Sequence, residues 1–176
     1  RPDPLASNIV LALPLSNRYQ HVGTDVHHLI KGSGSPKTLT NNGGILGYFK
    51  SNFYNSSGST YIADGSSQNI AISTSNDFSM STGDFTIECW IYPTTPSAAD
   101  GSLFVTQTLT GGEKYFAFNF DPGGEFNIYL NSAAANWSPT APEGLIEYTK
   151  WNHVALVKHS NVVKVYVNGL AIGSYS

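Results

Sequence analysis

Trp137 is the residue of this sequence best placed to contact a ligand from a loop. It stands between Asn136 and Ser138 in a segment of Ser, Ala and Pro, outside any expected strand. Sugars stack on Trp or Tyr rings and accept hydrogen bonds from amides, so Asn136 and Asn131 complete a candidate carbohydrate site with Trp137. Two other roles for the ring stay open: a contact between subunits, and a cover over the hydrophobic core.

Glu88 is the acidic residue that could serve glycoside hydrolysis. Retaining enzymes of that kind need two carboxylates about 5–5.5 Å apart, which on a strand means acidic residues at alternating positions of one face. Here Trp90 and Tyr92 stand at those positions. Neither a Gly-x-Ser-x-Gly elbow nor a phosphate-binding loop occurs. The sequence therefore argues against an enzyme.

Two sets of residues could hold a metal. His21 and the pair His27-His28 lie in a polar loop, where solvated His is the commoner case. Asp100 and Asp121 stand in loops beside Gly101 and Pro122, and Ca²⁺ takes six to eight hard oxygen ligands. No dense acidic pattern accompanies them. Calcium is thus a candidate cofactor, with ordinary turn Asp as the favoured alternative.

The composition excludes several classes of protein. Charged residues make up 12% of the 176 residues and the net charge is −3, so no basic surface for nucleic acid is expected. No apolar run approaches the roughly 20 residues that span a bilayer, so membrane insertion is not expected either. Cys89 stands alone, which excludes an internal disulfide and favours a small buried hydrophobe.

The elements that must position these residues are short strands separated by turn residues. Expected strands cover residues 8–15, 37–39, 60–63, 69–73, 84–93, 103–108, 115–120, 126–130, 151–158, 162–167 and 170–173. Asn168-Gly169 between the last two suits a type I′ hairpin turn. Such a series predicts an all-β sandwich or barrel.

The strand expected over residues 84–93 has two apolar faces. Phe85, Ile87, Cys89 and Ile91 face one way, and Thr86, Glu88, Trp90 and Tyr92 face the other. Large apolar groups on both faces predict a central strand, covered on two sides or by long loops. Trp90 and Trp151 are accordingly expected in the core.

Two segments resemble a known family. Ser66–Pro93 (SSQNIAISTSNDFSMSTGDFTIECWIYP) and Trp151–Gly173 (WNHVALVKHSNVVKVYVNGLAIG) are similar to stretches of laminin-G-like, concanavalin A-like domains. The resemblance implies an antiparallel β-sandwich of the jelly-roll type, one domain over residues 1–176, and a structural role for His153. It also implies a virion or extracellular setting, because this variant is common in bacteriophage virion proteins and bacterial adhesins.

The resemblance also contains a departure. The family continues for about thirty residues beyond the Asn-Gly hairpin to a final strand that pairs near the first, whereas this chain stops at Ser176. An open strand edge would remain, which natural proteins avoid. The expectation is therefore a segment of a longer protein, or a neighbouring chain that supplies the strand.

Two functions follow from the resemblance. In the first, the chain is a non-catalytic module of a phage fibre or decoration protein that recognises host-surface carbohydrate. In the second, it is a structural virion module that packs against a capsid or copies of itself. Its partners are accordingly carbohydrate or other surface proteins, and a homo-oligomer or larger assembly is expected.

Overall fold

The computed structural model describes residues 6–13, 23–24, 37–43, 45–47, 60–62, 68–78, 80, 83–94, 101–107, 115–121, 123–130 and 135–176. The chain divides into two compact units, Arg1–Phe78 and Ser79–Ser176. All described strand pairs are antiparallel, so the all-β prediction is confirmed. The prediction of one domain over 1–176 stays a prediction.

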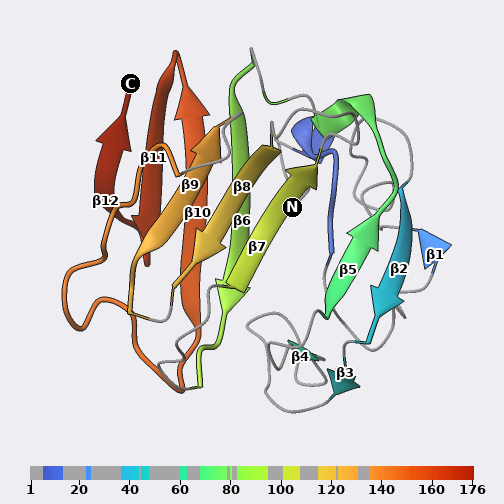
Figure 1. Cartoon of the computed structure of the whole chain (residues 1–176), viewed down its shortest axis with the longest axis horizontal. Helices are drawn as coiled ribbons and strands as arrows, with labels where there is room; N and C mark the ends of the chain where they lie inside the picture. The colour runs from blue at the N-terminus through green and yellow to red at the C-terminus, as the bar shows by residue number, and fades with distance from the viewer. Residues whose placement is uncertain are drawn as a thin grey trace. The chain divides into compact units, whose positions relative to one another are not determined.

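In its described residues, the unit Arg1–Phe78 contains short strands (Figure 1) and two 3₁₀ turns. One sheet has the order β1-β2-β5, from β1 (Gly23–Thr24), β2 (Thr38–Asn42) and β5 (Asn69–Ile72); β3 (Ile45–Gly47) pairs with β4 (Thr60–Ile62). The 3₁₀ turns are η1 (Ala6–Asn8) and η3 (Asn76–Phe78).

Lys37 joins three segments of this unit. Its side chain is 1% exposed, and its Nζ donates to the Val10 carbonyl oxygen at 2.5 Å. The same Nζ lies 2.5 Å from Asp77 Oδ2 and 5.5 Å from the centre of the Phe78 ring. Because a buried ammonium without partners is costly, these contacts are what allow Lys37 to be buried.

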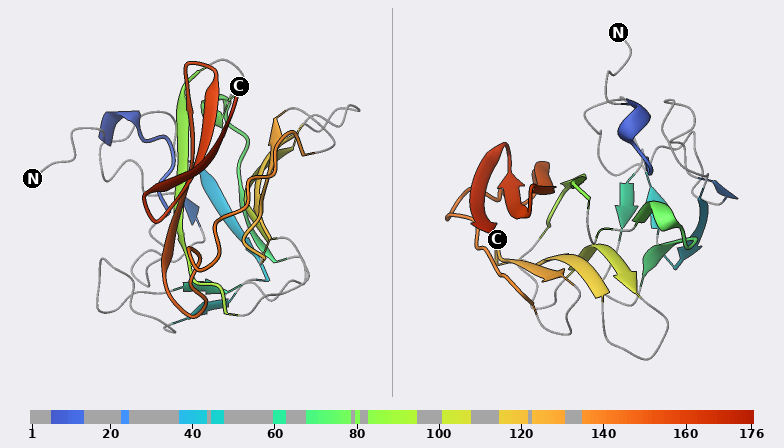
Figure 2. Two further views of the ribbon diagram at one scale, coloured as in Figure 1. Left: turned by 90° about the vertical axis from the view of Figure 1, so that its left-hand side faces the viewer. Right: turned by 90° about the horizontal axis from the view of Figure 1, so that it is seen from above.

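The unit Ser79–Ser176 is a sandwich of two sheets. The first has the order β12-β11-β10-β6, from β6 (Phe85–Ile91), β10 (Asn152–His159), β11 (Val162–Val167) and β12 (Leu170–Tyr175). The second has the order β7-β8-β9, from β7 (Gly101–Gln107), β8 (Tyr115–Phe120) and β9 (Phe126–Leu130). Figure 2 shows these sheets as two layers.

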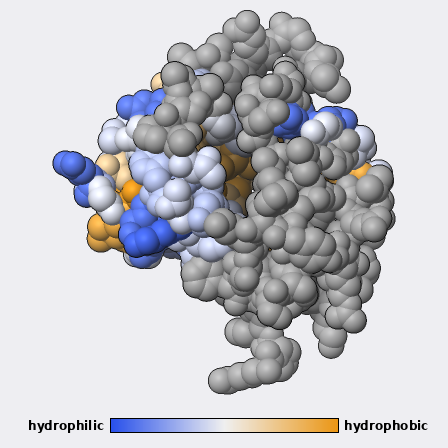
Figure 3. Space-filling model, turned by 90° about the horizontal axis from the view of Figure 1, so that it is seen from below, coloured by the Kyte–Doolittle hydropathy of each residue, from blue (hydrophilic) through white to orange (hydrophobic). Residues whose placement is uncertain are grey.

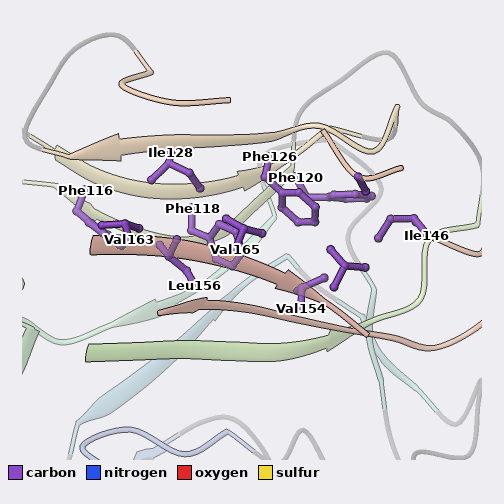
Figure 4. Packing of buried hydrophobic residues seen from close by; sticks show 12 residues of the cluster. Phe116, Phe118, Phe120, Phe126, Ile128, Ile146, Val154, Leu156, Val163 and Val165 are labelled. Carbon is purple, nitrogen blue, oxygen red and sulfur yellow. The ribbon is translucent and has the colours of Figure 1, made fainter. Parts of the chain in front are cut away.

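The hydrophobic core lies between the two layers. Alternate residues of the facing strands point inward, and the fully buried ones include Phe118, Phe126, Ile128, Leu156 and Val165 (Figure 4). Phe118 and Phe126 stack with ring centroids 5.7 Å apart. The alternation of apolar residues in these strands thus fixes which face of each strand is buried.

The turns of this unit follow the local sequence. Asn168 and Gly169 have φ of 49° and 84°, as a type I′ turn requires, and they join β11 to β12 as predicted. Ser160 and Asn161 also have positive φ, at 48° and 68°, and join β10 to β11.

Two sequence predictions about strands are wrong. Residues 8–13 form no strand: Asn8 ends η1, and the Val10 carbonyl is bound by Lys37 instead of a neighbouring strand. Residues 14 and 15 lie outside the described residues. β6 is the last of its sheet among the described strands, and its residues alternate between partly buried and exposed, so the prediction that both of its faces are covered is wrong.

Candidate functional site

The segment that carries Trp137 runs antiparallel beside β9. Ile128 N–H donates to the Trp137 carbonyl at 3.0 Å and Asn136 N–H donates to the Ile128 carbonyl at 2.8 Å. Further along, Phe126 N–H donates to the Pro139 carbonyl at 2.9 Å. Residues 136–141, called the edge segment below, therefore extend the β7-β8-β9 sheet, where the sequence predicted a loop.

The Trp137 ring lies against β12 at the side of the sandwich. It is half-buried and packs on the core, and a Cβ at Gly173 would lie 2.7 Å from its Cζ2 atom. The Tyr175 ring stacks on it, with centroids 6.3 Å apart and planes at 22°. Tyr175 is 37% exposed. Trp137 thus covers the core, one of its three expected roles, and gives Tyr175 a rigid support.

Polar side chains lie along the same segment. Asn136 is exposed, and its Oδ1 accepts a hydrogen bond from Leu130 N–H at 2.6 Å. Ser138 Oγ donates to Asn127 Oδ1 at 2.7 Å. Trp137 and Asn136 thus both lie on the edge segment, and their role in binding carbohydrate stays a prediction. Asn131 lies outside the described residues.

The residues considered for metal binding are mostly outside the described part of the chain. This holds for Asp100, His21 and His27-His28. Asp121 is described: its Oδ1 accepts from Gly123 N–H at 2.7 Å and its carbonyl accepts from Gly124 N–H at 2.8 Å. In the described ranges no three His, Cys, Asp or Glu side chains gather as a metal site. The described contacts of Asp121 are those of an Asp in a turn, and calcium binding with Asp100 stays a prediction.

A second group of polar and aromatic side chains lies on the face of the β6–β10 pair that points away from the core. Trp90 is 37% exposed, so the prediction that it belongs to the core is wrong. His153, directly opposite on β10, packs its ring against Trp90 with centroids 5.1 Å apart. Its Nε2 lies 3.4 Å from Glu88 Oε2. Alternation along residues 85–91 placed Glu88 and Trp90 on one face but could not show that this face is the outer one.

The backbone around His153 is held by two Asn side chains. Asn168 Oδ1 accepts from His153 N–H at 2.9 Å, and Asn168 Nδ2 donates to Asn152 Oδ1 at 3.1 Å. Asn152 is 1% exposed, and its Nδ2 donates to the carbonyls of Glu147 and Lys150. This network fixes the end of β10 against the hairpin and so fixes the position of His153.

Cys89 is on the opposite face of β6 and faces the core. Burial raises the pKa of its thiol to about 12, with a smaller contribution from the Glu88 carboxylate. A thiol with so high a pKa is not a nucleophile at neutral pH, which agrees with its expected role as a small hydrophobe.

Residues 64–176, more than half of the chain, match the family described as the concanavalin A-like lectin/glucanases superfamily, in its laminin-G-like branch. The chain belongs to this superfamily. The fold expected from the resemblance is therefore confirmed. Both binding proteins and glucanases carry the superfamily name. Among the described residues, the neighbours of Glu88 on its face include no second carboxylate: Thr86 and Trp90 lie along β6, and His153, Ala155 and Val157 lie on β10.

Comparison with solved structures gives one weaker likeness. The crystal structure of residues 221–444 of an S-layer domain-containing protein from Clostridium thermocellum is 17% identical, with a TM-score of 0.46. The match covers 88% of this chain and 65% of that one. No curated protein matches. Among the described residues, no helix has the length and hydrophobicity needed to cross a membrane.

Proposed function

We propose that this chain is a non-catalytic surface-binding module that recognises carbohydrate at the edge of its sandwich. The observation that carries the proposal is the Trp137–Tyr175 stack, in which the partly exposed Tyr175 ring rests on a ring anchored in the core. Exposed Asn136 lies beside it on the edge segment. Asn131, which closely precedes that segment, is a further proposed contact.

The chemistry of these groups suits a sugar. An aromatic ring offers a flat apolar surface to the C–H groups of a pyranose, and amides and hydroxyls bond its hydroxyl groups. A ring held by stacking loses little conformational entropy on binding, which favours affinity. Figure 3 shows hydrophobic groups reaching the surface between hydrophilic ones in the described region.

The proposed setting is a virion or another extracellular surface, where the module would belong to a fibre or decoration protein of a phage. Its partners there would be host glycans and other surface proteins. Calcium held by Asp100 and Asp121 remains part of this proposal, and the experiment below includes an arm for it.

A second candidate function is assembly with other surface proteins or with copies of the chain. It is favoured by β12, which lies at the end of its sheet among the described strands and carries Leu170 at 52% exposed and Tyr175 at 37%. An edge strand with exposed apolar side chains can pair with a strand of another chain.

The test is a glycan-array screen of the whole chain, in calcium and again in a chelator. Glycan binding is expected for the wild type and is expected to fall roughly tenfold or more in Tyr175→Ala, because the exposed stacking surface is removed. Leu170→Ala, at the other end of β12, is the matched control. An array that stays silent with a folded sample would exclude the carbohydrate function and favour assembly, which light scattering would measure.

A further inference from the structure

The outer face of the β6–β10 pair presents three groups suited to one small ligand. Trp90 offers a ring that is 37% exposed, Glu88 a side chain that is 63% exposed, and His153 one that is 28% exposed. His153 lies between the other two, touching the Trp90 ring and lying 3.4 Å from the Glu88 carboxylate.

These positions follow from rigid elements. Glu88 and Trp90 are two residues apart on β6, so their side chains share a face, and the register sets Ala155 and His153 opposite them on β10. Asn168 binds the His153 N–H and is itself bonded to buried Asn152. Side chains on strands that are fixed in this way are preorganised, which reduces the entropy cost of binding.

We propose that Glu88, Trp90 and His153 form a second carbohydrate-binding surface, separate from the edge site and selective for neutral sugars. This inference rests on the proposed function for the class of ligand, but it assigns different residues on a different sheet. The Trp90 ring stacks on the apolar face of the sugar. The Glu88 carboxylate accepts hydrogen bonds from neighbouring hydroxyl groups, and the imidazole donates or accepts one more.

The charge of Glu88 determines the selectivity. Its carboxylate would lie beside the bound sugar, and a sialic acid or uronic acid placed there would bring two negative charges together. Lys164 of β11 is the described basic side chain that the strand register places close to Glu88 on this face. Lys164 pairs with Val157, which is two residues along β10 from Ala155, the partner of Glu88. Neutral sugars are therefore expected to bind more tightly than acidic ones.

A wholly structural role for the three residues accounts less well for what is seen. Trp90 leaves more than a third of its surface exposed, and that exposed surface is available to a ligand. The contact between Glu88 and His153 is largely exposed and so adds little stability.

The experiment compares four chains by isothermal titration with the best neutral glycan from the array and with its sialylated form. They are the wild type, Trp90→Ala, Glu88→Gln and the matched control Thr86→Ala, whose side chain is exposed on the same face of β6. In Trp90→Ala the affinity of this second surface is expected to fall roughly tenfold while the edge site still binds, with no change for Thr86→Ala. Glu88→Gln is expected to narrow the preference for the neutral glycan over the sialylated one.

The titrations distinguish failure of the second surface from failure of the proposed carbohydrate function. Unchanged affinities in Trp90→Ala and Glu88→Gln, with loss of binding in Tyr175→Ala, would leave the edge site as the carbohydrate site and remove the second surface. If the wild type binds no glycan, both proposals fail. Circular dichroism of each variant shows that it is folded before titration.

Discussion

Asp84 joins the beginning of β6 to the turn between β10 and β11. Its Oδ1 accepts from Ser160 N–H at 2.9 Å, and its Oδ2 lies 2.7 Å from His159 Nδ1. The hydrogen bond from the Ser160 backbone, followed by that from the His159 side chain, holds the pKa of Asp84 below its usual value. A single surface carboxylate thus accepts hydrogen bonds from the turn between β10 and β11, in which Ser160 and Asn161 both have positive φ.

This pKa shift predicts how stability depends on pH. Because the pKa of Asp84 is lower in the folded than in the unfolded chain, the carboxylate stabilises the fold above the unfolded pKa. That contribution is lost as the pH falls through the folded pKa. The free energy of unfolding in urea, measured from pH 7 to pH 3, should therefore be lower for Asp84→Asn than for wild type at pH 7, and the two should converge in acid. A difference that is the same at every pH would contradict this account; exposed Glu143→Gln is the control.

The edge segment and β12 depend on each other through Gly173. The Trp137 ring occupies the space that a Cβ at this position would need, at 2.7 Å from Cζ2. The stack with Tyr175, and with it the proposed edge site, therefore requires a residue without a side chain on β12.

Gly173→Ala is expected to push the Trp137 ring off β12 and lower the free energy of unfolding by about 1–3 kcal/mol. Trp fluorescence should change in the folded state, and glycan binding at the edge site should weaken with it. Gly83→Ala is the control, because nothing lies within 4 Å of the added Cβ and its φ is not in the left-handed region. Equal stabilities of Gly173→Ala and wild type would show that the ring can move without cost.

The strands that sequence predicted best are those of the sandwich. The predicted bounds of β8, β9 and β11 are identical to the observed ones, because alternating apolar residues and flanking turns specify these strands locally. The edge segment was missed because Pro139 argues against a strand. In the structure the Pro139 carbonyl accepts a hydrogen bond from Phe126 N–H. Pro139 has no N–H of its own, and at the edge of a sheet this loses no hydrogen bond between strands.

At the scale of the whole molecule, the sequence could not assign the Trp residues to the core or to the surface. Trp137 was expected in a loop and packs on the core, whereas Trp90 was expected in the core and is exposed. Alternation shows that a strand has two faces, but which face meets the other sheet depends on contacts distant in sequence. The sequence therefore proposed Trp137 as a carbohydrate residue, whereas Trp90 was proposed only once its exposure was known.

The low charge of the whole molecule predicts that glycan binding does not depend on salt. Charged residues are 12% of the chain and the net charge is −3, and the proposed ligand is a neutral sugar. Screening acts on interactions between charges, so stacking and neutral hydrogen bonds persist when the Debye length shrinks.

The dissociation constant of the best neutral glycan, measured by titration from 50 to 500 mM NaCl, should change by less than about twofold. A binder of sulfated or phosphorylated polymers would instead lose affinity steeply over that range, since each charge contact releases counterions. A steep loss here would thus show that recognition rests on charge rather than on the aromatic rings.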